Sequence, residues 1–256
     1  MITLLRKIRK KLITEGRLSK YLIYAIGEIL LVVLGILIAL AINNWNEDRK
    51  DRAAEVVILN NLLNEFESNQ DRFRAIYQYK KEITEKWKNY LPLVSNPKGS
   101  IENRSMNRPN NGSQEYTSSN SVLNSILTSG TLDIITNDSL KHLISGWNEH
   151  LNAYKEIERR HVNLVENSLR QYETKHRIIK TYSGPDFSFD NPFYNNTTET
   201  ENLQRMIRII EDPEYQNLLL LNYMWMELTD QRSEVLDQRF EEMITALKNE
   251  LKSKTK

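Results

Sequence analysis

The sequence of 256 residues has no cysteine, few glycines and prolines, and almost no net charge. The absence of cysteine excludes disulfides, thiol nucleophiles and cysteine-ligated metals. The scarcity of glycine and proline leaves two long stretches, residues 36–91 and 214–252, without either residue. Stretches of this length without a breaker predict long helices. The balanced charge, with no basic cluster in the body of the chain, argues against binding to nucleic acid.

One long hydrophobic run stands out from this polar composition. From Tyr21 to Ile42 the only charged residue is Glu28. A helix of this length covers about 33 Å, whereas the hydrocarbon core of a bilayer is about 30 Å thick. Tyr21, Tyr24 and Trp45 flank the run, as aromatic residues do at membrane interfaces. The sequence therefore predicts a transmembrane helix over residues 21–43, with the lipid bilayer as a partner.

The flanks of this run predict its orientation. Residues 1–20 carry seven basic side chains and one acidic side chain. The positive-inside rule places this basic segment in the cytoplasm or on the inner leaflet, and residues 44–256 outside the cytoplasm. The alternative is a cleaved signal peptide, because Ala39-Leu40-Ala41 has the small-x-small form of a cleavage site. In both cases the body of the protein leaves the cytoplasm.

The acid within the span lies on a face of small residues. At heptad spacing this face contains Ala25, Glu28, Val32, Gly35 and Ala39. Small residues let a second helix approach closely, and an acid in such a seam is shielded from lipid. This pattern predicts contact with another membrane protein or with a second copy of the chain. The alternative is that Glu28, within about two turns of the cytoplasmic boundary, reaches the interface by itself.

The region after the span has a helical pattern throughout. Ten positions step by three and four, and eight are apolar: Leu59, Leu62, Phe66, Asn69, Phe73, Ile76, Lys80, Ile83, Trp87 and Tyr90. This seam is either a coiled-coil stripe or the core face of a bundle helix. Pro92 is the expected end of this helix, and the compositions of residues 92–116 and 182–199 predict mobile loops.

Local signals place the remaining helices. A short helix is expected before Gly130, a long one after a cap at Asn137 or Asp138, and another long one from Pro213 after a cap at Asp212. With a further short helix near residues 203–210, the sequence predicts an all-α protein. Its expected architecture is one transmembrane helix followed by an antiparallel bundle of two long helices and two or more shorter ones.

No constellation in the sequence favours catalysis. Glu-x-x-His occurs at Glu158–His161 and at Glu173–His176, which is a spacing used by di-iron bundles. Both pairs fall on one expected helix, about 22 Å apart, so they cannot form one site within a chain. They are interpreted as part of a solvated, charge-rich face. The sequence therefore predicts neither an enzyme nor a bound cofactor or metal.

The segment around the span resembles a known family. The matching motifs are Glu15-Gly16, Lys20–Leu22, Ala25–Glu28, Gly35–Leu40, Asn43–Asn46 and, further on, residues 127–145. They resemble a large bacterial family of uncharacterised single-span membrane proteins that carries only a domain-of-unknown-function label. The resemblance implies a Gram-negative inner-membrane protein with its body in the periplasm and no known activity.

The expected role is association with other proteins through the span and the helical body. The alternative is a sensory or signalling ectodomain that is coupled to a partner membrane protein. Long and short helices in one bundle suit ligand-gated helix motion, and a single helix would then carry the signal to the partner.

Overall fold

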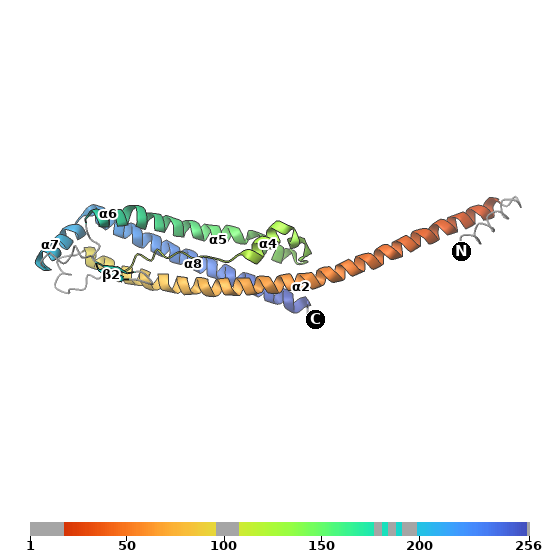
Figure 1. The fold of residues 1–256 in the computed structure, drawn as a ribbon, viewed down its shortest axis with the longest axis horizontal. Coiled ribbons are helices and arrows are strands. Elements are labelled where there is room, and N and C mark those ends of the chain that lie inside the picture. The colour runs from red at the N-terminus through yellow and green to blue at the C-terminus, as the bar shows by residue number, and fades with distance from the viewer. Residues whose placement is uncertain (1–17, 96–107, 177–180, 184–187, 191–198, 255–256) are drawn as a thin grey trace. The chain divides into compact units, whose positions relative to one another are not determined.

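The structure is a computed structural model of the chain (Figure 1). It describes residues 18–95, 108–176, 181–183, 188–190 and 199–254. The chain divides into two compact units, Met1–Val57 and Ile58–Lys256. Helix α2, Leu18–Ser95, contributes residues to both units.

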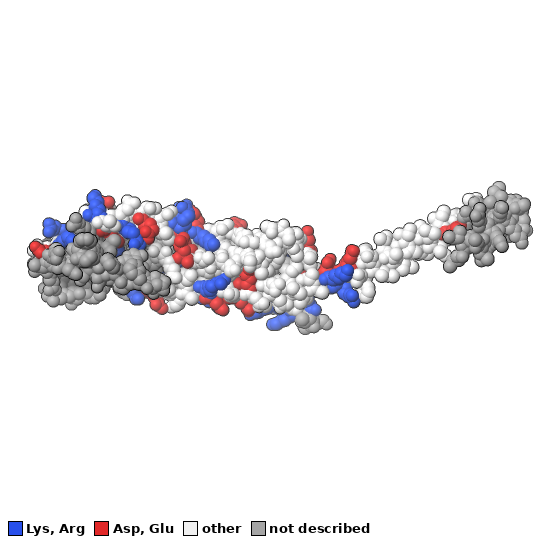
Figure 2. Space-filling model, in the orientation of Figure 1, with Lys and Arg blue, Asp and Glu red and all other residues white. Residues whose placement is uncertain are grey.

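The described part of the first unit is helical, and its residues 22–42 are uncharged except for Glu28. Every leucine, isoleucine and valine side chain from Leu22 to Ile42 is between 44 and 71% exposed. Within the described residues, α2 is the one helix long and apolar enough to cross a membrane, with a mean hydropathy of 2.8 over 18 residues, none of them buried. Figure 2 shows this stretch as an almost uninterrupted uncharged surface. A segment of this kind is either a membrane span or a signal sequence.

The second unit contains the other described elements. After α2 they are α4 (Ser121–Ser129), η1 (Thr131–Ile134), α5 (Asp138–Leu164), the π-helical turn η2 (Val165–Leu169), α6 (Arg170–Lys175), β1 (Thr181–Ser183), β2 (Ser188–Asp190), α7 (Glu199–Ile210) and α8 (Pro213–Lys254). The strands β1 and β2 form a short antiparallel hairpin. Three-residue strands are too short to show alternation, so the sequence carries no signal for them. The prediction of an all-α fold is confirmed.

Three long helices form the bundle. Helix α8 runs antiparallel to α2, because Glu67 of α2 pairs with Lys248 whereas Arg74, further along α2, pairs with Asp237. Helix α5 continues through η2 into α6 without a break. Its Trp147 contacts Phe66 of α2, at 4.7 Å between ring centroids, and its later residues contact later residues of α2. Helices α2 and α5 are therefore parallel.

An extended segment, residues 108–120, connects these two parallel helices. We call it the strap. It begins at an ion pair between Arg108 and Glu173 of α6 and ends beside α2, where the Asn69 side chain bonds both backbone groups of Ser119 at 2.8 and 3.0 Å. The strap therefore runs back along the bundle. Helix α5 can then begin at the end of the bundle where α2 enters, and run parallel to α2.

The expected loop over residues 92–116 corresponds to three regions of the structure. Pro92 lies inside the last turn of α2, which continues to Ser95. Residues 96–107 lie outside the described residues. Residues 108–116 form the first part of the strap, and Tyr116 is buried. Of the second expected loop, residues 182–199, the structure describes parts of the hairpin and the first residue of α7.

The predicted helix boundaries are explained by their capping groups. Gly130 has a φ of +74° after α4, a left-handed conformation that glycine adopts without strain. The Asn137 side chain accepts a hydrogen bond from the Leu140 backbone N–H at 3.1 Å. Asp212 accepts one from the Glu214 N–H at 2.9 Å, and Pro213 begins α8. These caps confirm the helix starts and the helix end that the sequence predicted.

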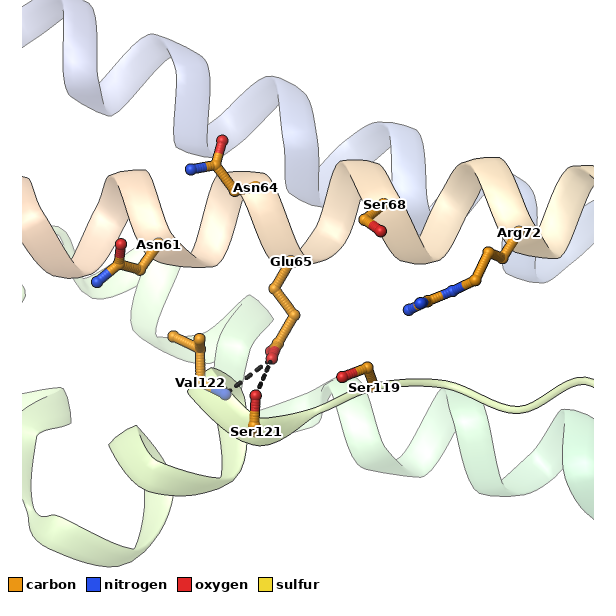
Figure 3. A pocket seen from close by; sticks show the side chains of 8 residues that line it. All are labelled: Asn61, Asn64, Glu65, Ser68, Arg72, Ser119, Ser121 and Val122. Carbon is orange, nitrogen blue, oxygen red and sulfur yellow. Dashed lines mark hydrogen bonds between the residues drawn. The ribbon is translucent and has the colours of Figure 1, made fainter.

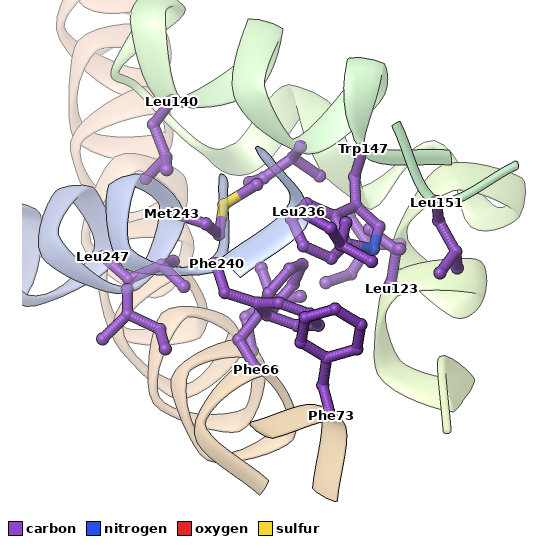
Figure 4. Close-up of a cluster of buried hydrophobic side chains, with 14 of the residues drawn as sticks. Phe66, Phe73, Leu123, Leu140, Trp147, Leu151, Leu236, Phe240, Met243 and Leu247 are labelled. Atoms are coloured by element: carbon purple, nitrogen blue, oxygen red, sulfur yellow. The ribbon is translucent and has the colours of Figure 1, made fainter. Parts of the chain in front are cut away.

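The buried side chains of the bundle form two clusters. The larger, which we call the Phe66 cluster, includes Phe66, Phe73, Trp147, Leu236 and Phe240 (Figure 4). The second, which we call the Trp87 cluster, includes Ile83, Trp87, Tyr90, Leu169, Tyr172, Tyr215 and Leu219. Nine of the ten seam positions predicted on α2 are buried, and Ile76 is partly buried. From Ile58 onward the seam is therefore the core face of a bundle helix.

Candidate functional site

The predicted site residues in the span all lie on α2. Ala25 and Glu28 are half-buried, and Val32, Gly35 and Ala39 are exposed. A side chain added at Gly35 would meet no atom within 4 Å, so this face is open to a neighbouring helix. The prediction that it contacts one stays a prediction.

The predicted interface anchors are described in part. Trp45 is 62% exposed, and the Arg49 guanidinium lies 5.9 Å from its ring centroid. The side chains of Tyr21 and Tyr24 lie outside the described residues. The anchoring role of all three residues stays a prediction.

A different candidate site lies inside the bundle, where the two clusters meet. Seven polar side chains are less than 5% exposed there: Lys80, Thr84, Glu158, His161, Asn222, Thr229 and Ser233. We call these residues the polar section. They come from α2, α5 and α8, which are the three long helices of the bundle. A polar layer of this depth in a helical core requires a partner for each charged group.

Lys80 and Glu158 form the charged centre of the polar section. Their side chains are only 5% and 2% exposed, and the ammonium group donates to Glu158 Oε1. The same carboxylate accepts from the Tyr154 hydroxyl at 2.7 Å and from the Tyr116 backbone N–H at 3.1 Å. Burial, followed by the nearby Glu158, raises the pKa of Tyr154. One carboxylate thus joins α2, α5 and the strap.

His161 and Asn222 connect α5 with α8. His161 Nε2 lies 2.9 Å from Asn222 Oδ1, so the neutral ring donates from Nε2 to this carbonyl oxygen. The Asn222 amide nitrogen in turn lies 3.6 Å from Met226 Sδ. Burial lowers the pKa of His161, and the positive charge of Lys80 lowers it further, while the bond to Asn222 opposes both. His161 is therefore neutral near pH 7.

Asp230 on α8 borders the polar section. Its Oδ1 is buried and has no hydrogen-bond partner among the described residues. Burial raises the pKa of Asp230 from 3.8 to about 6, and Glu227 adds to this, while Thr84, Lys80 and Lys81 oppose it. The pKa of Asp230 is therefore higher in the folded than in the unfolded state. Asp230 contributes its full stabilisation to the folded state below about pH 4, and this contribution is lost as the pH rises through about 6.

We expect Asp230→Asn to stabilise the body at high pH only. At pH 8 the variant should exceed the wild type by about 1–2 kcal/mol in free energy of unfolding, after allowance for the partial exposure of the group. At pH 4 the difference should be much smaller, because Asp230 is then protonated in the folded body and only about half ionised in the unfolded chain. Urea unfolding of the full chain in detergent micelles at the two pH values measures this. His161 is present in both proteins, so its opposing pH dependence cancels. An equal difference at both pH values would contradict the assignment.

The two Glu-x-x-His pairs are not part of a solvated face, and that interpretation is wrong for three of the four residues. Glu158, His161 and Glu173 are each at most 3% exposed. Glu173 pairs with Arg108 of the strap, and burial raises its pKa while Arg108 lowers it. His176 stacks on Tyr172 at 4.2 Å between ring centroids. Within the described residues, no group of three or more potential ligand side chains could hold a metal ion.

A surface hollow lies where α4 meets α2 (Figure 3). Its volume is about 320 Å³, and it is lined by Asn61, Asn64, Glu65, Ser68, Arg72, Ser119, Ser121 and Val122. Glu65 accepts from the backbone N–H groups of Val122 and Leu123 at 2.8 and 2.9 Å. A helix N-terminus attracts anions, and here the carboxylate of Glu65 already fills that position. The hollow is therefore explained by the capping of α4.

The polar section had a signal in the sequence. Asn69 and Lys80 are the two polar residues in a seam of otherwise apolar positions on α2. A lysine at a core position requires a buried acceptor. In the structure this acceptor is Glu158, which lies 78 positions further along the chain. The arrangement can hold a charge pair away from water and link three helices.

The fold and this site define an all-helical protein with an exposed apolar helix near its N-terminus and a helical body with a polar centre. A model described as "Family of unknown function (DUF6090)" matches residues 28–157. Because this is just over half of the sequence, the chain belongs to this family. No curated protein and no solved structure matches the chain. The matched residues extend from within the apolar run to α5 and include Lys80, while Glu158 lies one residue beyond them.

Proposed function

We propose that the chain is a single-span protein of the inner membrane of a Gram-negative bacterium. In this proposal residues 1–20 are cytoplasmic, residues 21–43 cross the bilayer and residues 44–256 form a periplasmic body. The exposure of every leucine, isoleucine and valine side chain from Leu22 to Ile42 carries the proposal. Soluble monomers rarely expose contiguous apolar patches larger than a few hundred Å², whereas a helix in lipid exposes such side chains at no cost.

The proposed role is association with other proteins, without catalysis. The face with Glu28, Gly35 and Ala39 is the proposed contact in the membrane, either with a second copy or with another membrane protein. The small residues Gly35 and Ala39 on this face support the proposal, because a neighbouring backbone can approach closely where side chains are small. A buried or paired position for Glu28 would also avoid the free-energy cost of an acid in lipid.

A sensory or signalling ectodomain is the second candidate function. The polar section favours it, because buried charge pairs seldom increase stability over apolar packing and are retained where they give specificity or a switch. In this candidate the body responds to a periplasmic signal, and α2 transmits the change to a partner in the membrane.

We expect substitutions on the small-residue face to reduce cross-linking in cells. Glu28→Leu and Gly35→Leu should each lower the yield of a defined cross-linked species at least about fivefold, since a coupling of about 1 kcal/mol has an effect of this size. Gly27→Leu is the matched control, because Gly27 also has open space around it but lies off that face. The species is isolated from the membrane fraction in mild detergent and identified by mass spectrometry.

The same preparation tests the anchor. The recovered chain should have an intact mass that includes residues 1–41, whereas a chain that starts at Ile42 would show a cleaved signal peptide. Equal cross-linking in the wild type and in all three variants would contradict association through this face. It would direct the search for partners to the body.

A further inference from the structure

The body contains two apolar clusters of unequal size. Among the described residues, the Phe66 cluster has 18 buried apolar side chains and the Trp87 cluster has 11. On α2 the polar section lies between Phe73 and Trp87, and on α5 it lies between Tyr154 and Leu169. On α8, Thr229 and Ser233 lie between Met226 and Leu236, while Asn222 lies between Leu219 and Met226 of the Trp87 cluster. Polar side chains therefore take the place of apolar ones in all three helices where the clusters meet.

The energetics of the polar section favour opening at this level. Lys80 and Glu158 lose their hydration in the folded body, and their mutual attraction offsets this loss only in part. When water enters, both groups regain hydration, so exposing them costs less than exposing apolar side chains of similar size. The π-helical turn η2, Val165–Leu169, follows His161 within one turn. Such turns interrupt the regular hydrogen bonds of a helix and often occur at functional sites.

The strap is held separately in the two parts of the body. Beside the Trp87 cluster, Arg108 pairs with Glu173, and the Trp87 indole N–H donates to the Asn110 carbonyl at 2.7 Å. Beside the Phe66 cluster, Asn69 holds Ser119 through two hydrogen bonds. Release of the first set of contacts leaves the second intact. The first half of the strap can therefore leave the bundle while the second half stays in place.

We propose that the polar section is a joint, at which the part of the body around the Trp87 cluster opens as one unit while the part around the Phe66 cluster stays folded. Opening frees the first half of the strap and exposes the Trp87 cluster to a partner or to solvent. This device is independent of the proposed contact within the membrane. It gives the signalling candidate a physical mechanism, because the free energy of opening is the quantity that a signal would change.

Hydrogen exchange of the full chain in lipid nanodiscs, followed by mass spectrometry at increasing urea below the unfolding transition, tests the joint. In the wild type, amides of residues 83–94 and 213–226 should exchange together. They should exchange at least about tenfold faster than amides of residues 59–73 and 236–247, which corresponds to about 1.4 kcal/mol.

The double variant Lys80→Met/Glu158→Gln should reduce this difference at least about threefold. It removes both charges and keeps an acceptor oxygen for Tyr154 and Tyr116. The control Lys81→Met/Glu234→Leu removes a similar pair with side chains 52% and 58% exposed, and it should leave the difference unchanged.

Two results would overturn the joint. The first is exchange of both clusters in a single transition in the wild type, which decides the question even if the double variant fails to fold. The second is an unchanged difference in a folded double variant, because the polar section would then have no part in separating the clusters.

Discussion

Lys80→Met is expected to lower the free energy of unfolding of the body by about 3–5 kcal/mol, the usual range when one member of a buried ion pair is removed. Glu158 would remain 3% exposed with the Tyr154 hydroxyl and the Tyr116 N–H as its neutral donors. These two hydrogen bonds stabilise a carboxylate less than a cation in contact does. The loss therefore measures the free energy of an unpaired buried charge.

Two variants separate this cause from the loss of side-chain packing. Lys81→Met, next in the sequence, removes a cation that is 52% exposed, and it should change stability by less than about 1 kcal/mol. The double variant Lys80→Met/Glu158→Gln should recover most of the loss, because no charge stays buried. Chemical denaturation of the four full-length proteins in the same micelles makes the comparison. Equal effects of Lys80→Met and Lys81→Met would show that the Lys80 ammonium reaches water.

Local signals in the sequence predicted most of the helical architecture. The seam on α2, the glycine after α4, and the caps at Asn137 and Asp212 all correspond to features of the structure. These features depend on residues within a few positions of one another, so a single sequence contains the information. The boundary at Pro92 differed by three residues. A proline removes one backbone donor of the last turn and does not prevent that turn from forming.

The arrangement of the helices and the polar section could not be predicted in this way. Parallel α2 and α5 require the strap, whose contacts with Asn69 and Glu158 join residues 42 to 50 positions apart. Glu158 and His161 lie in a segment rich in Glu and Arg, where helical spacing does not distinguish a buried carboxylate from a solvated one. The burial of these residues follows only from tertiary contacts.

The face of the span is a different case. Its residues share one side of α2 by helical geometry alone, and the described structure contains no second helix against it that would test the contact. The sequence and the structure therefore give the same information about Glu28, Gly35 and Ala39. The cross-linking comparison of Gly35→Leu with Gly27→Leu adds the missing observation.

Phe240→Ala is expected to cost about 3–5 kcal/mol in free energy of unfolding, as large-to-small changes of buried aromatic residues do. Phe240 is fully buried. Its ring centroid lies 4.6 Å from that of Trp147, 5.7 Å from that of Phe73 and 6.2 Å from that of Phe66 (Figure 4). The substitution removes ring contacts with α2 and α5 together, and the rigid neighbouring rings cannot collapse into the cavity. Denaturation of the full chain in micelles measures the loss, and an effect below about 1 kcal/mol would contradict this packing.

Val235→Ala is the control on the same helix, since Val235 is 45% exposed and should change stability by no more than about 0.5 kcal/mol.

The location of the Phe240→Ala effect in hydrogen exchange also tests the proposed joint. If the Trp87 cluster opens while the Phe66 cluster stays folded, a cavity at Phe240 lowers protection around the Phe66 cluster. It leaves the exchange rates around the Trp87 cluster unchanged, because the contacts broken in that opening do not include Phe240. A body that unfolds as one unit would instead lose protection in both clusters by the same factor.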